Sequence, residues 1–121
     1  MILRDWIDAL FAAIDGKDAE AFTGFIAEDA RFVFANQPAV EGRDAIRDFV
    51  AGFFASIRAV SHRVPDTWRA EDAVICRGEV TYVRHDGTAL TVPFANVLVM
   101  HGDRVRDYRI YMDASALFAQ Q

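Results

Sequence analysis

The sequence predicts an α+β fold, with helices packed on one face of a curved, mostly antiparallel sheet. Apolar residues recur at helical spacing in residues 2–15, 19–26 and 42–57. Residues 62–112 contain β-type runs separated by turns. Because the helical patterns come first and the long β-type run comes last, the order is typical of helices gathered on one side of an antiparallel sheet.

The first half of the chain carries clear start and stop signals for its helices. Gly16 ends the first helix, and Asp18 is placed to cap the second, over residues 19–26. A short strand rich in Phe and Val is expected at 30–35. The strongest amphipathic pattern follows at 42–57, where the sequence Gly-Arg-Asp marks the helix start.

The second half of the chain predicts consecutive hairpins. Asp86-Gly87 and Gly102-Asp103 have the composition of tight β-turns, so the flanking strands should pair antiparallel. A short terminal helix is expected at 114–121, directly after Asp113. The expected strands cover residues 62–69, 74–84, 89–100 and 105–112.

Length, composition and charge limit the class of protein. The 121 residues are 53% apolar, enough for the core of one domain, residues 1–121. The net charge of -5 and the single lysine, Lys17, argue against a nucleic-acid partner, since that binding needs clustered positive charge.

Cysteine content and the N-terminal pattern indicate the compartment. Cys76 is the only cysteine, so the chain cannot form an internal disulfide or a metal site built on several thiolates. No stretch approaches the roughly 20 apolar residues that span a membrane, and no signal-peptide pattern begins the chain. We therefore expect a cytoplasmic protein without a membrane partner.

One polar residue interrupts an apolar row in residues 91–113. Alternation along this stretch places Phe94, Asn96 and Leu98 on the same face of a strand. A lone amide in such a row is either a core group satisfied by its neighbours or the polar anchor of a ligand cavity. The sequence leaves both interpretations open.

Four short motifs are similar to one known family. The chain resembles the SnoaL-like branch of the NTF2-like superfamily over nearly its whole length, in the motifs D-G-K-D-A-E-A-F at 15–22, A-E-D-A-R-F at 27–32, V-E-G-R-D-A-I at 40–46 and Y-R-I-Y-M-D at 108–113. The resemblance implies a cone-shaped fold whose bent sheet and first helices enclose a deep, mainly apolar pocket. It also implies a homodimer formed across the outer face of the sheet.

The catalytic residues of two better-known branches are not retained. In proteins similar to ketosteroid isomerase, the catalytic base would fall at about Phe34, and an oxyanion donor at about Asn96. A phenylalanine cannot accept a proton, whereas an amide can still donate to an oxyanion. In proteins similar to limonene-epoxide hydrolase, the water-activating group would fall at about Thr81, Glu79, Ile110, Phe32 and Phe34, and none of that set is retained.

Three ionisable residues remain as catalytic candidates. His62 begins a strand and has the side chain best suited to proton transfer near neutral pH. For Glu79, hydrophobicity alone places Val80 and Tyr82 in the core, whereas alignment with the family places Glu79 inward, and we follow the alignment. Asp113 is either a helix cap, which explains it fully, or a pocket residue.

The sequence thus predicts a pocket and two possible functions. The catalytic candidates are Asn96, His62, Glu79 and Asp113, and the expected pocket walls are Trp6, Phe34, Phe54, Tyr108 and Met112, with core packing the simpler role for Trp6. The first possibility is an enzyme of isomerase, cyclase, hydratase or hydrolase type, acting on a small apolar molecule without cofactor or metal. The second is a non-catalytic domain that binds such a ligand or mediates dimer contacts.

Overall fold

The computed structural model describes residues 2–118. These residues form three helices and one six-stranded sheet, in the order α1 (Leu3–Asp15), α2 (Ala19–Thr23), β1 (Ile26–Phe34), β2 (Val40–Glu41), α3 (Arg43–Ser56), β3 (Ala59–Ala70), β4 (Ala73–Val83), β5 (Ala89–His101) and β6 (Arg104–Tyr111).

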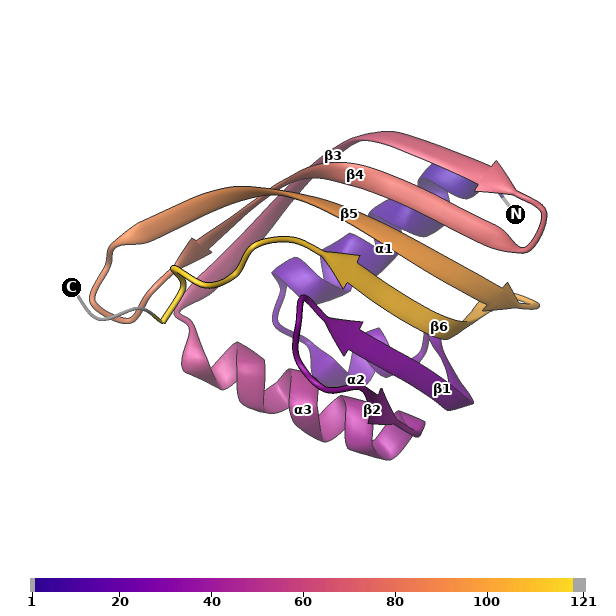
Figure 1. The fold of residues 1–121 in the computed structure, drawn as a ribbon, viewed down its shortest axis with the longest axis horizontal. Helices are drawn as coiled ribbons and strands as arrows, with labels where there is room; N and C mark the ends of the chain where they lie inside the picture. Colours follow the sequence, from indigo (N-terminus) through magenta and orange to yellow (C-terminus); the bar gives the residue numbers. More distant parts are fainter. Residues whose placement is uncertain (1, 119–121) are drawn as a thin grey trace.

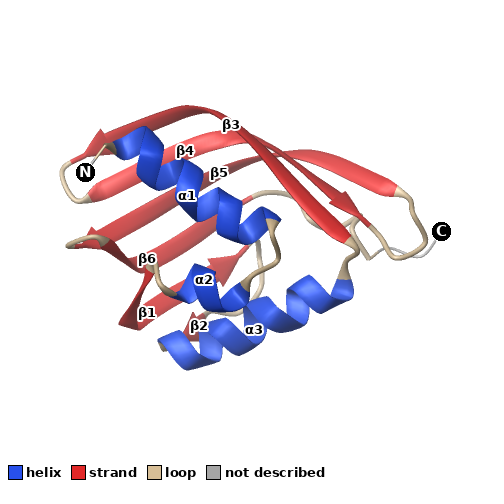
Figure 2. Ribbon diagram, turned by 180° about the vertical axis from the view of Figure 1, so that it is seen from behind, coloured by secondary structure: helices blue, strands red, loops and turns tan. Residues whose placement is uncertain are grey.

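The strands follow the spatial order β2-β1-β6-β5-β4-β3. Only the pairing of β1 with β6 is parallel, and the other neighbours are antiparallel. The sheet is strongly curved, and the helices all lie on its concave side (Figure 1). Seen from that side, α1 crosses the long strands while α2 and α3 lie beside the β1 end (Figure 2). The predicted α+β fold and cone shape are confirmed.

The second helix is shorter than the sequence predicted. Asp18 caps it as expected, because its Oδ1 accepts a hydrogen bond from the Ala21 N–H at 3.0 Å. The helix ends at Thr23, however, and β1 begins at Ile26 rather than near residue 30. The Phe25 carbonyl accepts a hydrogen bond from Val105 at 2.8 Å, so pairing with β6 overrides the helical pattern.

The prediction of a terminal helix at 114–121 is wrong for residues 114–118, the part of that range that the structure describes. Residues 115–117 form a turn, and residues 119–121 lie outside the described chain. The Arg84 guanidinium donates to the carbonyls of Ala116 and Leu117, at 2.9 and 2.8 Å, and Leu117 is buried. These tertiary contacts fix a turn where local sequence favoured a helix.

A bulge bends the sheet where β3 faces β4. The pairing register shifts between Arg63 and Asp66, and Gly78 lies opposite the shift. A side chain at position 78 would collide with the carbonyl oxygen of Arg63, so only glycine allows this close approach. The bulge and the glycine together let the long strands curl around the helices.

The core fills the space between the helices and the concave face. Its fully buried members come from every layer, including Leu10 of α1, Ile46 of α3 and Leu98 of β5. Within residues 2–118, none of the helices combines the length and the apolar character needed to cross a lipid bilayer.

Candidate functional site

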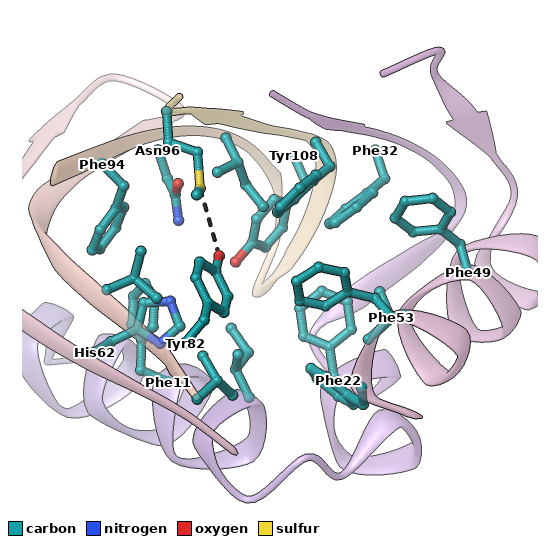
Figure 3. A pocket seen from close by; sticks show the side chains of 18 residues that line it. Phe11, Phe22, Phe32, Phe49, Phe53, His62, Tyr82, Phe94, Asn96 and Tyr108 are labelled. Atoms are coloured by element: carbon teal, nitrogen blue, oxygen red, sulfur yellow. Dashed lines mark hydrogen bonds between the residues drawn. The ribbon is translucent and has the colours of Figure 1, made fainter. Parts of the chain in front are cut away.

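A cavity of about 60 Å³ lies between the concave face of the sheet and the helices. Ten of its 18 lining residues are phenylalanine or tyrosine, so its wall is mostly aromatic (Figure 3). Only four lining side chains carry nitrogen or oxygen, namely His62, Tyr82, Asn96 and Tyr108. An apolar cavity with a few converging polar groups is the usual form of a small-molecule site.

Asn96 is the cavity residue whose buried polar atom lacks a partner within the described residues. It lies between Phe94 and Leu98 on the concave face of β5 and is 2% exposed. Its Oδ1 accepts no hydrogen bond within residues 2–118. A buried polar atom without a partner costs about 1–3 kcal/mol. Because the side chain points into the cavity (Figure 3), a ligand N–H or O–H group is the natural partner for this oxygen. The Nδ2 group of the same amide lies at the cavity as a hydrogen-bond donor.

His62 is held in place by a carboxylate from the first helix. Its Nδ1 lies 2.6 Å from Oδ1 of Asp15, and its backbone N–H donates to Oδ2 of the same carboxylate at 3.0 Å. The imidazole lies against the rings of Phe11 and Phe94, with centroids 4.7 and 5.3 Å away. Since the carboxylate of Asp15 accepts a hydrogen bond from the Nδ1–H group, neutral His62 carries its basic lone pair on Nε2.

The free ring nitrogen of His62 is therefore the basic atom of the site. Nε2 makes no hydrogen bond to the described residues, and the ring projects into the cavity beside Tyr82 (Figure 3). The His62 side chain is 10% exposed, against 30% for Asp15, so the pair is shielded but not sealed. This arrangement suits a general base oriented by a carboxylate.

Two tyrosine hydroxyls complete the polar set. The Tyr82 hydroxyl donates weakly to the Met112 sulfur at 3.5 Å, and Figure 3 shows the Tyr108 hydroxyl also directed at the cavity centre. Burial raises the pKa of Tyr82, and burial, with smaller contributions from Cys76 and Tyr82, raises the pKa of Tyr108. Both therefore stay protonated at neutral pH and can donate hydrogen bonds.

The structure brings most of the predicted site residues to one cavity. It is lined by His62, Asn96, Phe34, Phe54, Tyr108 and Met112. Trp6 does not line it; that ring packs edge-on against Phe25, 5.7 Å between centroids, and so belongs to the core.

The expectation that Glu79 faces inward is wrong. Its side chain is 52% exposed on the convex face and pairs with Arg63 at 3.1 Å. The adjacent Val80 and Tyr82 are buried and line the cavity, as hydrophobicity alone indicated. Residues along β4 alternate between the two faces, so either the two apolar side chains or the carboxylate must be buried. Burying the apolar side chains lowers the free energy, whereas burying an unpaired carboxylate raises it.

Asp113 also lies outside the cavity. It is exposed just beyond the end of β6, where its Oδ1 accepts a hydrogen bond from the Ser115 N–H at 3.0 Å. Hydrogen bonding to Ser115 holds the pKa of this carboxyl below its usual range. The residue thus caps a turn rather than a helix.

Sequence analysis missed two of the residues that meet at the site. Asp15 was taken only as the end of α1 before Gly16, and Tyr82 was expected on the outer face. The strong alternation of β4 was the available signal for Tyr82. No local pattern connects Asp15 with His62, which is 47 positions away. No cluster of three or more metal-ligating side chains occurs within residues 2–118.

Solved structures of similar fold define the class of protein. A protein of ketosteroid isomerase-like fold from Catenulispora acidiphila DSM 44928, in complex with trimethylamine, is 26% identical, with a TM-score of 0.85 over 95% of this chain and 90% of that one. A proposed SnoaL-like polyketide cyclase from Jannaschia sp. CCS1 is 20% identical, with a TM-score of 0.80 over 93% and 86% of the two chains. An NTF2-like protein from Burkholderia pseudomallei K96243 is 13% identical, with a TM-score of 0.84 over 94% and 92%.

These similarities establish an NTF2-like, ketosteroid isomerase-like fold. Residues 7–108 match the sequence model of the SnoaL-like domain, so the protein belongs to the SnoaL-like domain family. No curated protein sequence matches the chain significantly.

Proposed function

We propose that this protein is a cofactor-independent enzyme that moves a proton on a carbon adjacent to a carbonyl group, in a small and mostly apolar molecule. The observation that supports this proposal is the imidazole of His62, which is hydrogen-bonded to Asp15 and faces the same apolar cavity as the amide of Asn96 and two neutral phenols. A base and a set of hydrogen-bond donors on one enclosed volume are what enolisation requires.

The proposed step assigns a role to each group. Nε2 of His62 takes the proton from the α-carbon, and the C–H electrons form the new C=C bond as the carbonyl oxygen becomes an enolate. Asp15 stabilises the resulting imidazolium, while Asn96, Tyr82 and Tyr108 donate hydrogen bonds toward the oxygen. If the substrate carries a β,γ-double bond, the dienolate takes the proton back from His62 at its γ-carbon, which gives isomerisation. If it carries a second carbonyl, the enolate carbon attacks that carbonyl carbon and the new alkoxide takes the proton from His62, which gives ring closure.

Similar proteins support the reaction class and the ligand size. Relatives in fold include proposed polyketide cyclases and a proposed isomerase from Bacillus subtilis. The trimethylamine complex shows that a protein 26% identical to this one binds a molecule of only a few atoms. A cavity of about 60 Å³ matches a ligand portion of that size.

A direct test measures proton exchange without knowledge of the natural substrate. Cyclopentanone in D₂O supplies α-protons whose replacement by deuterium is followed by ¹H NMR. We expect the wild-type protein to accelerate exchange, and His62→Gln to slow it by about 10²–10⁴-fold, the usual contribution of a general base. Glu79→Gln, on the convex face, serves as the matched control and should leave the rate unchanged.

The same measurement separates enzyme from binder. If cyclopentanone shifts the resonances of the cavity residues but its protons exchange no faster than in buffer, the enzyme proposal fails and the non-catalytic binding function is correct. An equal loss of rate in Glu79→Gln and His62→Gln would also contradict the assigned roles.

Homodimer formation and a cytoplasmic location remain predictions from the sequence. A dimer would give a light-scattering mass near twice 13.6 kDa at micromolar concentration. A mass near 13.6 kDa would contradict it.

A further inference from the structure

A second hollow lies immediately outside the aromatic wall of the cavity. This outer groove, of about 490 Å³, runs between residues 48–53 of α3 and residues 114–118, with Phe34 at its base. It shares Phe34, Phe49 and Phe53 with the cavity, so the two volumes are separated by single side chains. The groove and the cavity are therefore neighbouring compartments of one region.

Phe53 is the central member of the shared wall. Its ring lies 5.1 Å from that of Phe34, 5.7 Å from that of Tyr82 and 6.5 Å from that of Phe118, measured between centroids. The ring thus lines the cavity, as Figure 3 shows, and it also lines the groove. A ligand that spanned the two volumes would therefore have to displace this side chain.

The two compartments differ greatly in capacity. The cavity, at about 60 Å³, is far below the roughly 300–1,000 Å³ typical of sites for ring-containing ligands, so it takes only a small ketone group. The groove, at about 490 Å³, falls within the roughly 300–1,000 Å³ typical of sites for ring-containing ligands. A ligand with a ring system would have to extend into the groove.

The lining of the groove is apolar and carries no positive charge. Among residues 2–118, Gln37 and Asp48 are the only polar side chains that line it, and Asp48 lies 3.4 Å from Arg47. Phe118 is 60% exposed, an unusual state for a large aromatic residue. Arg84 holds the turn that carries it through two hydrogen bonds to main-chain carbonyls. The exposed apolar surface is therefore held in place rather than loose.

We propose that the outer groove is a second binding subsite, which takes the uncharged aromatic body of the ligand whose carbonyl end occupies the cavity. This inference rests on the proposed function and defines its substrate class as aryl ketones or fused-ring ketones. Phe53 turns aside to admit the link between the two parts, and the rings of Phe49 and Phe118 stack against the aromatic body.

Two ketones and two leucine variants test the subsite. Cyclopentanone fits the cavity alone, whereas 2-acetylnaphthalene adds a fused-ring body. Gly52 lines the groove, and an added side chain there meets no atom within 4 Å, so Gly52→Leu fills the groove without strain and favours the helix. Ala51→Leu places the same side chain on the next residue of α3, which does not line the groove.

Dissociation constants measured by equilibrium dialysis give the result without any need for turnover. We expect wild-type protein to bind 2-acetylnaphthalene at least tenfold more tightly than cyclopentanone. Gly52→Leu should weaken 2-acetylnaphthalene at least tenfold and leave cyclopentanone unchanged, while Ala51→Leu alters neither. Nuclear Overhauser effects between the naphthyl protons and Leu117 or Phe118 should locate the body in the groove.

Several outcomes would overturn the subsite. They are equal affinity of the wild type for both ketones, no binding of 2-acetylnaphthalene, or Gly52→Leu weakening both ketones alike. A failure of the proposed function would give another result. Both ketones would still bind, with the same effect of Gly52→Leu, but the protein would not accelerate α-proton exchange.

Discussion

The two faces of strands β4 and β5 are built from alternate residues of the same stretches of chain, yet they treat polar groups in opposite ways. On the convex face, Glu79 pairs with Arg63 at 3.1 Å and the hydroxyls of Thr81 and Thr91 lie 2.8 Å apart. On the concave face, Asn96 is buried among apolar groups and its Oδ1 has no partner within the described residues.

The difference shows which polar groups serve folding and which serve binding. Paired and exposed groups on the convex face contribute little free energy, and they cost little as well. An unpaired buried amide lowers stability by the loss of its hydration, so its presence is better explained by a ligand than by the fold. The following predictions test this contrast, from the largest expected effect to the smallest.

Truncation of adjacent residues on β5 should separate the two faces most clearly. Leu98 is fully buried on the concave face, and Leu98→Ala should lower the free energy of unfolding by about 2–5 kcal/mol. Val97 is its partly exposed neighbour on the convex face, and Val97→Ala should cost less than about 1 kcal/mol. Urea unfolding monitored by circular dichroism gives both values, and similar losses would contradict the assignment of faces.

Alkaline pH should destabilise the protein through groups on the concave side. Burial raises the pKa of the Cys76 thiol to about 12 and also raises the pKa of Tyr82 and of Tyr108. The folded state keeps these protons after the unfolded chain has lost them, so stability is full below the ordinary pKa values and falls above them. Each group should contribute about 1.4 kcal/mol per pH unit, from about pH 9 for the thiol and about pH 10 for the phenols.

Urea unfolding at pH values from 8 to 11 measures this slope. Cys76→Ala should remove the part that begins near pH 9 and leave the part that begins near pH 10. In the native protein at pH 8, the thiol should resist a disulfide reagent that labels it quickly after unfolding. Rapid labelling of the folded protein would show that Cys76 is not buried as described.

Replacing the amide of Asn96 should raise the stability of the fold and weaken ligand binding. Asn96→Leu keeps the number and branching of the side-chain heavy atoms and removes an unsatisfied polar group, so we expect the free energy of unfolding to rise by about 1 kcal/mol. Cyclopentanone binding should weaken, because one donor to its oxygen is lost. A lower stability in Asn96→Leu, measured by urea unfolding, would show instead that the amide is satisfied in the folded protein.

The smallest effect should come from the convex ion pair. A double-mutant cycle with Arg63→Ala and Glu79→Ala should give a coupling free energy of about 0.2–1 kcal/mol, because both side chains are largely exposed. The coupling should shrink further in 1 M salt. A coupling above about 2 kcal/mol would mean that this face contributes more to stability than its exposure indicates.

Sequence patterns predicted the parts of the site that depend on local alternation. Asn96 lies on the concave face because β5 alternates without interruption, and the helix start at Gly42 followed from its local sequence. The orientation of Glu79 was mispredicted because alignment with relatives was preferred over the apolar pattern of Val80 and Tyr82.

The remaining features depend on contacts between distant segments. Asp15 meets His62 only because α1 lies across β3 in the folded protein, and no spacing in the sequence encodes that contact. The terminal turn depends likewise on Arg84, whose hydrogen bonds to residues 116 and 117 replace the helix that local propensity favoured.

The bulge at Gly78 limits how this site can be redesigned. The curvature of the sheet depends on the absence of a side chain at position 78, since even a methyl group there would collide with the Arg63 carbonyl. Larger or smaller cavities must therefore be obtained by exchanging the aromatic lining. Any library that varies position 78 would mostly sample damaged sheets, whereas one that fixes it as glycine keeps the frame while the specificity changes.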